Sequence, residues 1–383
     1  MPESSPTRMS KTIFCSNTFL LSLLLPVLAA VILYQLDPFD PAPLPTHEFS
    51  AQPFFVPLQN PRLLEGVERV GFGELLGPED LAYDPKLGVI YTSCGDGWIK
   101  RVTVNESAAD SVVESWVNTG GRPLGVVLGH DDDVIVADAF KGLLRATAGG
   151  IEVLTTEAEG VEFKLTDGVD ITDEGMIYFT DASSKYDLKE ALKDIMGGRP
   201  YGRFMSYDLS TKQTEVLVRD LYFVNGVAVS PDQQFVVFCE TVMRRCKRYY
   251  IQGEKKGFVD IFIDNLPGVP DNIRYDGEGQ YWIALHWGNT FSFNLAQRYP
   301  FIRKVMAIVE KYRGKPHLEK YAGVLAVDLE GKPIAHYYDP ALAMISGGIK
   351  IADHLYCGSL DKRYIIRLNL TQYPAVSNVV TRS

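Results

Sequence analysis

The sequence is poor in the residues and motifs on which common catalytic machinery depends. Its 383 residues include five Cys and six His, and neither a CxxC pair nor a zinc-type spacing occurs. The chain also lacks a GxSxG nucleophile elbow, an HExxH motif and a P-loop. These absences argue against zinc-finger, zincin, α/β-hydrolase and P-loop nucleotide chemistry.

Positive charge is also scarce. Lys and Arg number 38 against 48 Asp and Glu, giving a net charge of −10 and a pI of about 5.2. No basic patch of the kind that follows a nucleic-acid backbone is present, so nucleic acid is not an expected partner. In contrast, 46% of the residues are hydrophobic, with 19 Phe and 20 Tyr, which is ample for the core of one domain.

The most informative feature of the sequence is a motif that recurs six times. Each copy has a small-residue turn, a short alternating strand, a turn rich in Asp, Gly or Pro, and a β-branched or aromatic strand. The copies begin at Pro78, Pro123, Thr166, Val224, Pro270 and Ser346. The second residues of successive copies are 45, 43, 58, 46 and 76 residues apart. A period in the forties predicts an all-β fold, a six-bladed β-propeller, in which radial stacking leaves no long sheet edge exposed.

The second residue of each copy would lie on a ring around the propeller axis. These residues are Glu79, Leu124, Asp167, Asn225, Asp271 and Gly347, and Asn272 follows one of them. Four of the six are acidic or amide side chains with hard oxygen donors, and none carries sulfur. Such a set favours one axial Ca²⁺ held by Glu79, Asp167, Asn225, Asp271 and Asn272. The alternative is that Asp and Asn before Gly are ordinary turn residues.

A second group of polar residues is expected on the same face. The second strand of each copy runs back, so its last residue returns to the side of the ring. These residues are Ser93, Asp138, Asp181, Glu240, His286 and Ser359. We therefore take His286, Glu240, Asp181 and Asp138 as candidates for general acid or base. The alternative is that they only satisfy turns.

Two of the gaps between copies hold helical insertions. Residues 186–199 contain DLKEALKDIMGG, which predicts a short helix ending at Gly. Residues 287–321 contain FIRKVMAIVEKY, whose apolar spacing is helical. Insertions of a propeller lie over one face, so both could be lids over a pocket, or they could pack against the outside of a blade.

The N-terminal region contains one long apolar run. Residues 18–36 read TFLLSLLLPVLAAVILYQL, with Arg8 and Lys11 before the run and Asp37 after it. This charge pattern predicts a cytosolic N-terminus and a lumenal propeller. The run is either an uncleaved type II anchor or a signal peptide cleaved near Ala29–Ala30. The expected organisation is therefore residues 1–36 as tail and signal or anchor helix, 37–61 as an extended Pro-rich linker, and 62–383 as the propeller.

If the protein enters the secretory pathway, two further sequence features become relevant, namely N-glycosylation sequons and a possible disulfide. Asn105 and Asn369 begin N-glycosylation sequons, NES and NLT. Cys239 and Cys246 fall on successive strands of one copy, where they could pair across a hairpin or remain buried free thiols.

The repeat copies carry a family resemblance. The segments GPEDLAYD, LTDGVDI, FVNGVAVSPD and PDNIRYDGEGQYWIAL are similar to the strictosidine synthase-like branch of the superfamily that includes paraoxonases, regucalcin and gluconolactonases, also called calcium-dependent phosphotriesterases. The resemblance runs from about Pro61 to Leu370. It implies a six-bladed propeller, and it suggests the endoplasmic reticulum, the vacuole or the cell exterior as location.

The resemblance also implies site residues. Glu79, Asn225 and Asp271 match the shared metal ligands, Asn272 matches the additional Asn of paraoxonases, and Asp167 stands where Asn is usual. Two positions depart from the family patterns. The NPHG-like turn of paraoxonases is RPLG here, with Leu124 in place of His. The last repeat, which holds the catalytic Glu in strictosidine synthase, reads SGGIKI, with Gly347 and Gly348.

Three functions follow as hypotheses. The first is a calcium-dependent hydrolase of esters, lactones or related small molecules, in which a rim group activates water. The second is strictosidine synthase-type Pictet–Spengler condensation in alkaloid biosynthesis, against which the missing carboxylate in the last repeat counts. The third is a non-catalytic binding propeller with a structural calcium. The oligomeric state is left open.

Overall fold

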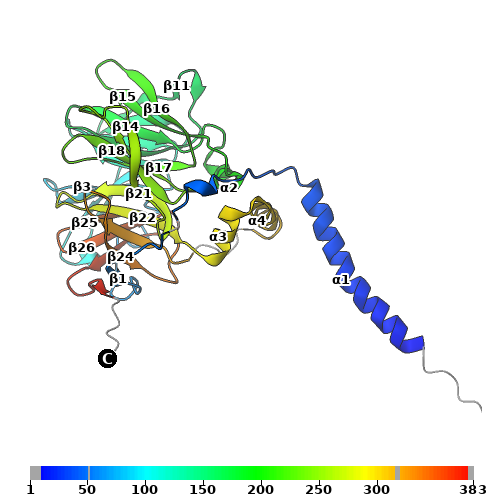
Figure 1. Ribbon diagram of the computed structural model, residues 1–383. Helices are drawn as coiled ribbons and strands as arrows, with labels where there is room; N and C mark the ends of the chain where they lie inside the picture. Colours follow the sequence, from blue (N-terminus) through cyan, green and yellow to red (C-terminus); the bar gives the residue numbers. More distant parts are fainter. Residues whose placement is uncertain (1–9, 51, 315–319, 378–383) are drawn as a thin grey trace, which may run out of the picture.

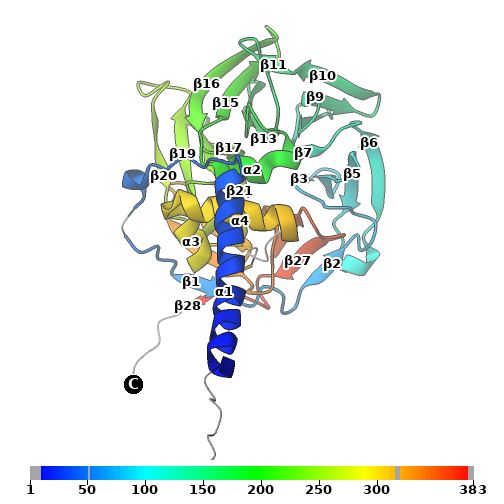
Figure 2. The same ribbon diagram turned by 90° about the vertical axis from the view of Figure 1, so that its right-hand side faces the viewer.

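The computed structural model describes residues 10–50, 52–314 and 320–377. In these residues, six sheets surround a central axis and each forms one blade, whose own strands pair antiparallel (Figures 1 and 2). The predicted six-bladed β-propeller is therefore confirmed.

Each blade contributes its first strand to the centre of the molecule, where the innermost strands of successive blades contact one another. From the axis outward, blade 1 is β3 (Leu81–Asp84), β4 (Val89–Ser93), β5 (Trp98–Thr103) and β6 (Val113–Asn118). Blade 2 is β7 (Pro123–Leu128), β8 (Val134–Asp138), β9 (Gly142–Thr147) and β10 (Gly150–Thr155). Blade 3 is β13 (Thr166–Ile171), β14 (Met176–Asp181), β15 (Gly202–Asp208) and β16 (Gln213–Leu221), preceded by the small hairpin β11 (Glu157–Ala158) and β12 (Val161–Glu162).

The second half of the ring follows the same order. Blade 4 is β17 (Val224–Val229), β18 (Phe235–Glu240), β19 (Arg245–Tyr250) and β20 (Val259–Ile263). Blade 5 is β21 (Gly268–Tyr275), β22 (Tyr281–Gly288), β23 (Gly323–Val327) and β24 (Pro333–Tyr338). Blade 6 begins with β25 (Ile345–Ile351), β26 (His354–Ser359) and β27 (Ile365–Asn369).

The two ends of the chain close the ring. Strand β2 (Glu68–Val70) pairs antiparallel with β27 and becomes the outermost strand of blade 6. Strand β1 (Leu58–Asn60) joins blade 5 parallel to β24 and also pairs with β28 (Val376–Ser377). The buried Arg367 of β27 reinforces the closure, because its Nε donates to Glu68 at 2.6 Å and its guanidinium reaches two carbonyls next to blade 1.

The innermost strands approach one another closely, and glycine makes this approach possible. A Cβ added to Gly125 or Gly168 would lie 2.4 Å from the carbonyl oxygen of the ring residue in the next blade, Asp167 or Asn225 respectively. A Cβ on Gly226 would lie 2.6 Å from the Asp271 oxygen. The third position is therefore glycine in blades 2, 3 and 4, because backbone of the next blade occupies the space that a side chain would need.

Hydroxyl groups fasten neighbouring blades at the same level. Thr180 donates to the carbonyl of Asn225 at 2.8 Å, Thr241 to that of Pro270 at 2.8 Å, and Ser346 to that of Glu79 at 2.8 Å. Each bond is buried and crosses from one blade to the next, so the ring backbone has partners on both sides.

Strand pairing is irregular at the ring positions. In blades 2 to 6 the register between the first two strands shifts where the repeat begins, for example between Thr166 and Val169. A bulge at this point interrupts the alternation of side chains. It accounts for how successive residues such as Asp271 and Asn272 can both face the axis.

The α-helices of the described residues lie on one side of the propeller (Figures 1 and 2). They are α1 (Ser10–Leu36), α2 (Ala191–Gly197), α3 (Phe291–Arg298) and α4 (Pro300–Arg313). The helices predicted in both insertions are confirmed as α2 and α4, and α2 ends with Gly198 in the left-handed conformation, at φ 61°. Helix α4 contacts both α2 and α3, and residues of α2 and α4 line the cavity at the ring. The alternative of packing on the outside of a blade is therefore wrong.

Helix α1 contains the apolar run that suggested a signal or anchor segment. Within the described part of the chain, no helix combines the length and the apolar character that crossing a bilayer requires. The anchor and the cleaved signal peptide both stay predictions.

The close approach of the inner strands gives a first prediction. Gly226→Ala is expected to destabilise the protein by more than about 2 kcal/mol, because the new methyl group meets backbone atoms that cannot move without opening the ring. Gly197→Ala is the matched control, since no atom lies within 4 Å of its added Cβ. Denaturant unfolding of both variants tests this expectation. Equal midpoints would show that the ring can expand to accept a methyl group.

Candidate active site

A cavity of about 210 Å³ lies at the mouth of the ring, beneath the helical cap. Its floor contains Glu79, Asp167, Asn225 and Asp271, and His286 stands beside them. Its walls are mainly apolar and come from both the blades and the cap. The principal wall residues are Leu124, Leu188, Leu192, Ile195, Phe223, Trp287, Met344 and Leu360. The site is thus a polar floor within an apolar chamber, as is usual for small-molecule sites.

The ring residues predicted from the repeat converge on this floor. Glu79, Asp167, Asn225 and Asp271 are each between 2% and 6% exposed. Asn272 is also buried, and its Nδ2 donates to Glu79 Oε1 at 2.8 Å. Asn272 therefore holds Glu79 in place from beneath, while the other four side chains reach the cavity.

The floor is short of positive charge and of hydrogen-bond donors. Glu79 Oε2 and Asn225 Oδ1 are buried oxygen atoms without a hydrogen-bond partner. Burial is the first cause and the neighbouring carboxylates are the second, so the pKa values of Glu79 and Asp167 lie well above their ordinary range. The buried Arg122 offsets only part of this repulsion.

These donors fit a hard cation. Carboxylate and amide oxygens are the ligands that Ca²⁺ prefers, and a cation would both satisfy the unpaired oxygens and relieve the repulsion. Within the described ranges, no three His, Cys, Asp or Glu side chains form a ready-made metal cluster. The residues on the floor that could hold a cation are Glu79, Asp167 and Asp271, with the amide oxygen of Asn225.

A buried ion pair occupies the axis close to this floor. Arg274 of β21 pairs with Asp80, with Nε 3.2 Å from Oδ1, and also donates to the Val126 and Val169 carbonyls. Asp80 in turn accepts the amide of Val126 at 3.0 Å. This network joins blades 1, 2, 3 and 5, and it neutralises one of the four carboxylates gathered at the centre.

His286 is held by one of the ring carboxylates. Its Nδ1 lies 2.9 Å from Asp271 Oδ2, and the edge of the Trp287 ring packs against it at a centroid distance of 5.0 Å. A carboxylate on Nδ1 selects the tautomer that leaves Nε2 free to accept a proton. The structure thus places His286 on the cavity wall, next to the floor.

The other three candidate acid or base residues lie elsewhere. Asp138 accepts the Arg122 amide and Asp181 accepts the Leu165 amide, so each closes the loop leading into its own blade. Glu240 does the same for Tyr222. None of the three carboxylates is among the residues that line the cavity.

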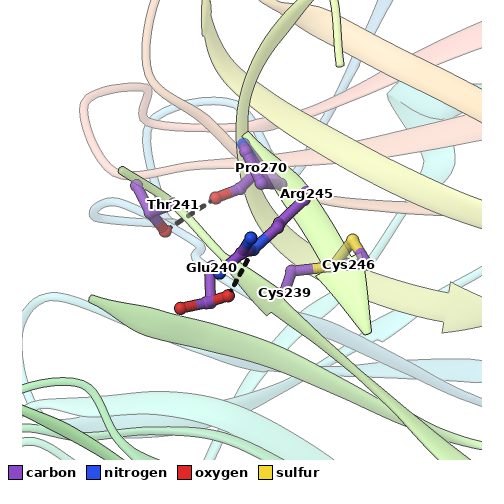
Figure 3. Close-up of a disulfide and its surroundings, with 6 residues drawn as sticks. All are labelled: Cys239, Glu240, Thr241, Arg245, Cys246 and Pro270. Atoms are coloured by element: carbon purple, nitrogen blue, oxygen red, sulfur yellow. Dashed lines mark hydrogen bonds and ion pairs between the residues drawn. A yellow bond between two sulfur atoms is a disulfide. The ribbon is translucent and has the colours of Figure 1, made fainter. Parts of the chain in front are cut away.

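Each of these carboxylates also binds a side chain, either through an ion pair with an arginine or through a hydrogen bond from a hydroxyl group. Asp181 pairs with Arg203 at 2.7 Å, and Asp138 accepts from Thr119 at 2.7 Å. Glu240 pairs with Arg245 at 2.6 Å, beside the disulfide between Cys239 and Cys246 (Figure 3). Of the two possibilities for these cysteines, the disulfide is the one that forms.

The last repeat has no room for a catalytic side chain. A Cβ on Gly347 would lie 2.7 Å from the Glu79 carbonyl oxygen, and one on Gly348 would lie 2.8 Å from Val324. A glutamate at position 347 would meet backbone of blade 1, and one at position 348 would meet the Val324 side chain. The second-repeat position is filled by Leu124, which contributes to the apolar wall.

Comparison with known proteins places the chain in a family. The strictosidine synthase model matches residues 167–254, and the strictosidine synthase-like N-terminal model matches residues 59–102. Protein STRICTOSIDINE SYNTHASE-LIKE 6 of Arabidopsis thaliana is 53% identical over 95% of this chain and 98% of its own length. The chain belongs to the strictosidine synthase-like family. An adipocyte plasma membrane-associated protein of Bos taurus is 33% identical over 91% of this chain and 88% of its own length.

More distant solved structures share the fold of this strictosidine synthase-like protein. A gluconolactonase from Xanthomonas campestris superposes with a TM-score of 0.56 at 14% identity, covering 87% of this chain and 99% of its own. Regucalcin of Agrobacterium tumefaciens, described as a calcium-binding protein, gives 0.54 at 14% identity, covering 82% and 95%. The strictosidine synthase-like resemblance read from the repeats is thus confirmed, and the two solved structures support the propeller fold.

Several cavity residues of this strictosidine synthase-like protein escaped the sequence analysis. Thr241, Phe223, Met344 and Leu360 lie in loops next to the repeat copies and carry no periodic signal. Trp287 could have been predicted as a cavity residue, because it directly follows His286, the histidine predicted on the rim.

Buried polar residues hold the helical cap over the cavity. Arg303 of α4 donates to the Met196 carbonyl of α2 at 3.3 Å and to the Ala42 carbonyl of the linker. Gln297 of α3 donates to the Val242 carbonyl of blade 4 at 2.7 Å and accepts from Arg244. The cap is therefore a tethered part of the domain.

The cap also contains a buried acid that gives a second prediction. Asp194 of α2 is 1% exposed, accepts from Ser183 at 2.5 Å and has an unpaired Oδ1. Burial raises its pKa from 3.8 to about 7. Because the pKa of Asp194 is higher in the folded state, ionisation of this residue lowers the free energy of unfolding. This destabilisation is absent below pH 3.8 and grows as the pH rises to about 7.

Asp194→Asn removes this cost. The variant should gain stability relative to the native protein as the pH rises from about 4 to 7, by at most about 1.4 kcal/mol per pH unit, and the difference should then level off. Thermal unfolding across this range, with hydrogen exchange of α2, measures it. The exposed Asp173→Asn is the control. A difference that does not change with pH would contradict the assignment.

Proposed function

We propose that this protein is a calcium-dependent hydrolase of small esters or lactones. The observation that carries the proposal is the convergence of three buried carboxylates and two unpaired oxygens beneath an apolar chamber, with His286 fixed on Asp271 beside them. When bound, Ca²⁺ supplies a Lewis acid that polarises a carbonyl or phosphoryl oxygen. Glu79, Asp167, Asn225 and Asp271 would hold it.

The protein's own residues would perform the remaining tasks. The apolar walls bind the substrate body and exclude bulk water from the floor. Asp271 orients the His286 ring, and Nε2 takes the proton from the attacking water and returns it to the leaving oxygen. Asp138, Asp181 and Glu240 hold the blades that carry the ring, since their oxygens are already engaged.

A second function is a binding propeller with a structural calcium. The specific observation that favours it is that, of the four candidate acid or base residues, His286 alone faces the cavity. Pictet–Spengler condensation has less support, because Gly347 and Gly348 are packed against neighbouring backbone and side chain and offer no acid or base.

A secretory location is also part of the proposal. The Cys239–Cys246 disulfide is typical of an oxidising compartment. Asn105 is exposed, as glycosylation requires, whereas Asn369 is half-buried. The membrane-associated name of the bovine relative supports a tether through residues 18–36.

Asn225→Ala tests the metal site and the hydrolase together. Without this amide oxygen, calcium should no longer raise the thermal midpoint, and hydrolysis of 4-nitrophenyl acetate or dihydrocoumarin should fall by roughly 100-fold or more. Native protein treated with a chelator should behave in the same way and recover with Ca²⁺. Asn294→Ala, on the cap but outside the cavity lining, is the control. Full activity of a folded Asn225→Ala variant would contradict the proposed calcium-dependent hydrolase function.

His286→Gln separates catalysis from ion binding. The variant should keep the calcium-dependent rise in thermal midpoint, since His286 is not placed among the ligands, and should lose roughly 10²- to 10⁴-fold in kcat. Measuring both quantities on one preparation distinguishes the two functions. If calcium stabilises the native protein and no ester or lactone is turned over, the binding propeller is the better description.

A further inference from the structure

The exposed apolar side chains of this protein are unevenly distributed. Helix α4 and the neighbouring α3 place six large hydrophobic side chains in solvent within 23 residues. These are Phe291, Tyr299, Phe301, Val305, Val309 and Tyr312, which are 41% to 78% exposed. Single exposed apolar residues are ordinary, but a contiguous group of this size marks an interaction surface.

The spacing along α4 shows that the group is organised. Phe301, Val305 and Val309 are four residues apart, and Tyr312 follows three residues later, so they form one stripe along one side of the helix. Arg303, on another side, is 2% exposed and bonded to α2 and the linker. Helix α4 therefore packs on the domain with one side and presents an apolar stripe with another.

Charge distinguishes this surface from the rest of the molecule. Residues 291–313 contain five basic residues and one acidic residue, a net charge of +4, in a chain whose total is −10. The basic residues are Arg298, Arg303, Lys304, Lys311 and Arg313, of which Arg303 is buried against α2 and the linker and is not part of the surface. An apolar stripe flanked by basic and aromatic residues is the composition of a helix that lies in a lipid headgroup region.

The surface continues into the exposed end of α1. Lys304 Nζ lies 4.7 Å from the centre of the Tyr34 ring, and Lys311 Nζ lies 3.2 Å from Asp37 Oδ2. Eight side chains of α1 between Leu24 and Leu36 are large, apolar and 44% to 76% exposed. In Figures 1 and 2, α1 extends from the side of the propeller that carries α4.

We propose that the exposed face of α3 and α4 is a docking surface for an anionic lipid membrane. The stripe inserts among the acyl chains next to the headgroups, and Arg298, Lys304 and Lys311 contact the anionic headgroups. The surface adjoins α1, and it orients the cavity toward the membrane because Glu310 of α4 lines the cavity. The proposal does not depend on hydrolase activity.

The test uses the full chain and locates α4 relative to lipid, because α1 alone could retain the protein on vesicles. Val309→Cys and Phe258→Cys are each labelled with bimane in a Cys15→Ser background. Phe258 is 57% exposed and lies between β19 and β20, far from the cap in sequence, and is the control. The remaining cysteines are buried or paired. Vesicles contain phosphatidylcholine and phosphatidylserine, with or without doxyl-labelled lipid.

The label at position 309 should be quenched about threefold or more above the label at position 258, and added salt or Lys304→Glu should weaken this difference. Val305→Asp should reduce quenching at position 309 without altering the thermal midpoint. Equal quenching at both positions, or none, would overturn the proposal. Absent quenching together with a dimer in analytical ultracentrifugation would instead assign the face to a second copy of the chain.

Discussion

The close contact of six innermost strands is the constraint from which the site follows. Glycine at the third position in blades 2, 3 and 4 lets the backbones meet, and hydroxyl bonds such as Thr180 to Asn225 fix them there. The side chains of Glu79, Asp167 and Asp271 line the same cavity, and their negative charges raise one another's cost of ionisation. The buried Asp80–Arg274 pair neutralises one further carboxylate at the centre. The remaining charge is what makes the floor a place for a cation.

The same geometry divides polar residues into two kinds. Residues that face the axis keep an oxygen without a hydrogen-bond partner, as Glu79 Oε2 and Asn225 Oδ1 do. Strand-end carboxylates such as Asp181, in contrast, accept from backbone amides and guanidinium groups. Only the residues that face the axis can bind a ligand readily, because an oxygen with a full set of hydrogen bonds has no free lone pair for one. His286 is intermediate, because one ring nitrogen is fixed and the other is available.

Sequence alone predicted the six blades, the five oxygen-bearing ring residues and both insertion helices, because each depends on a local pattern. It could not separate His286 from Asp138, Asp181 and Glu240, because their partners Arg122, Leu165 and Tyr222 are 16 to 18 residues away and belong to non-repeating loops. The closing strand β2 was missed because three residues carry no periodicity. The buried partner of Arg274 could have been predicted, because Arg274 is a charged residue within the inner strand of the fifth copy, and a buried charge requires a partner.

The pairing of β2 with β27 has a consequence for how the protein is made. The strand at Glu68–Val70 and its partner at Ile365–Asn369 are far apart in the chain, with a separation of 299 residues between the paired Glu68 and Arg367. Blades 1 to 5 can form as they emerge from the ribosome, but the ring stays open until β27 has been synthesised. A premature stop between Ser359 and Ile365 would therefore leave blades 1 to 5 complete, blade 6 without β27, and β2 without its partner strand.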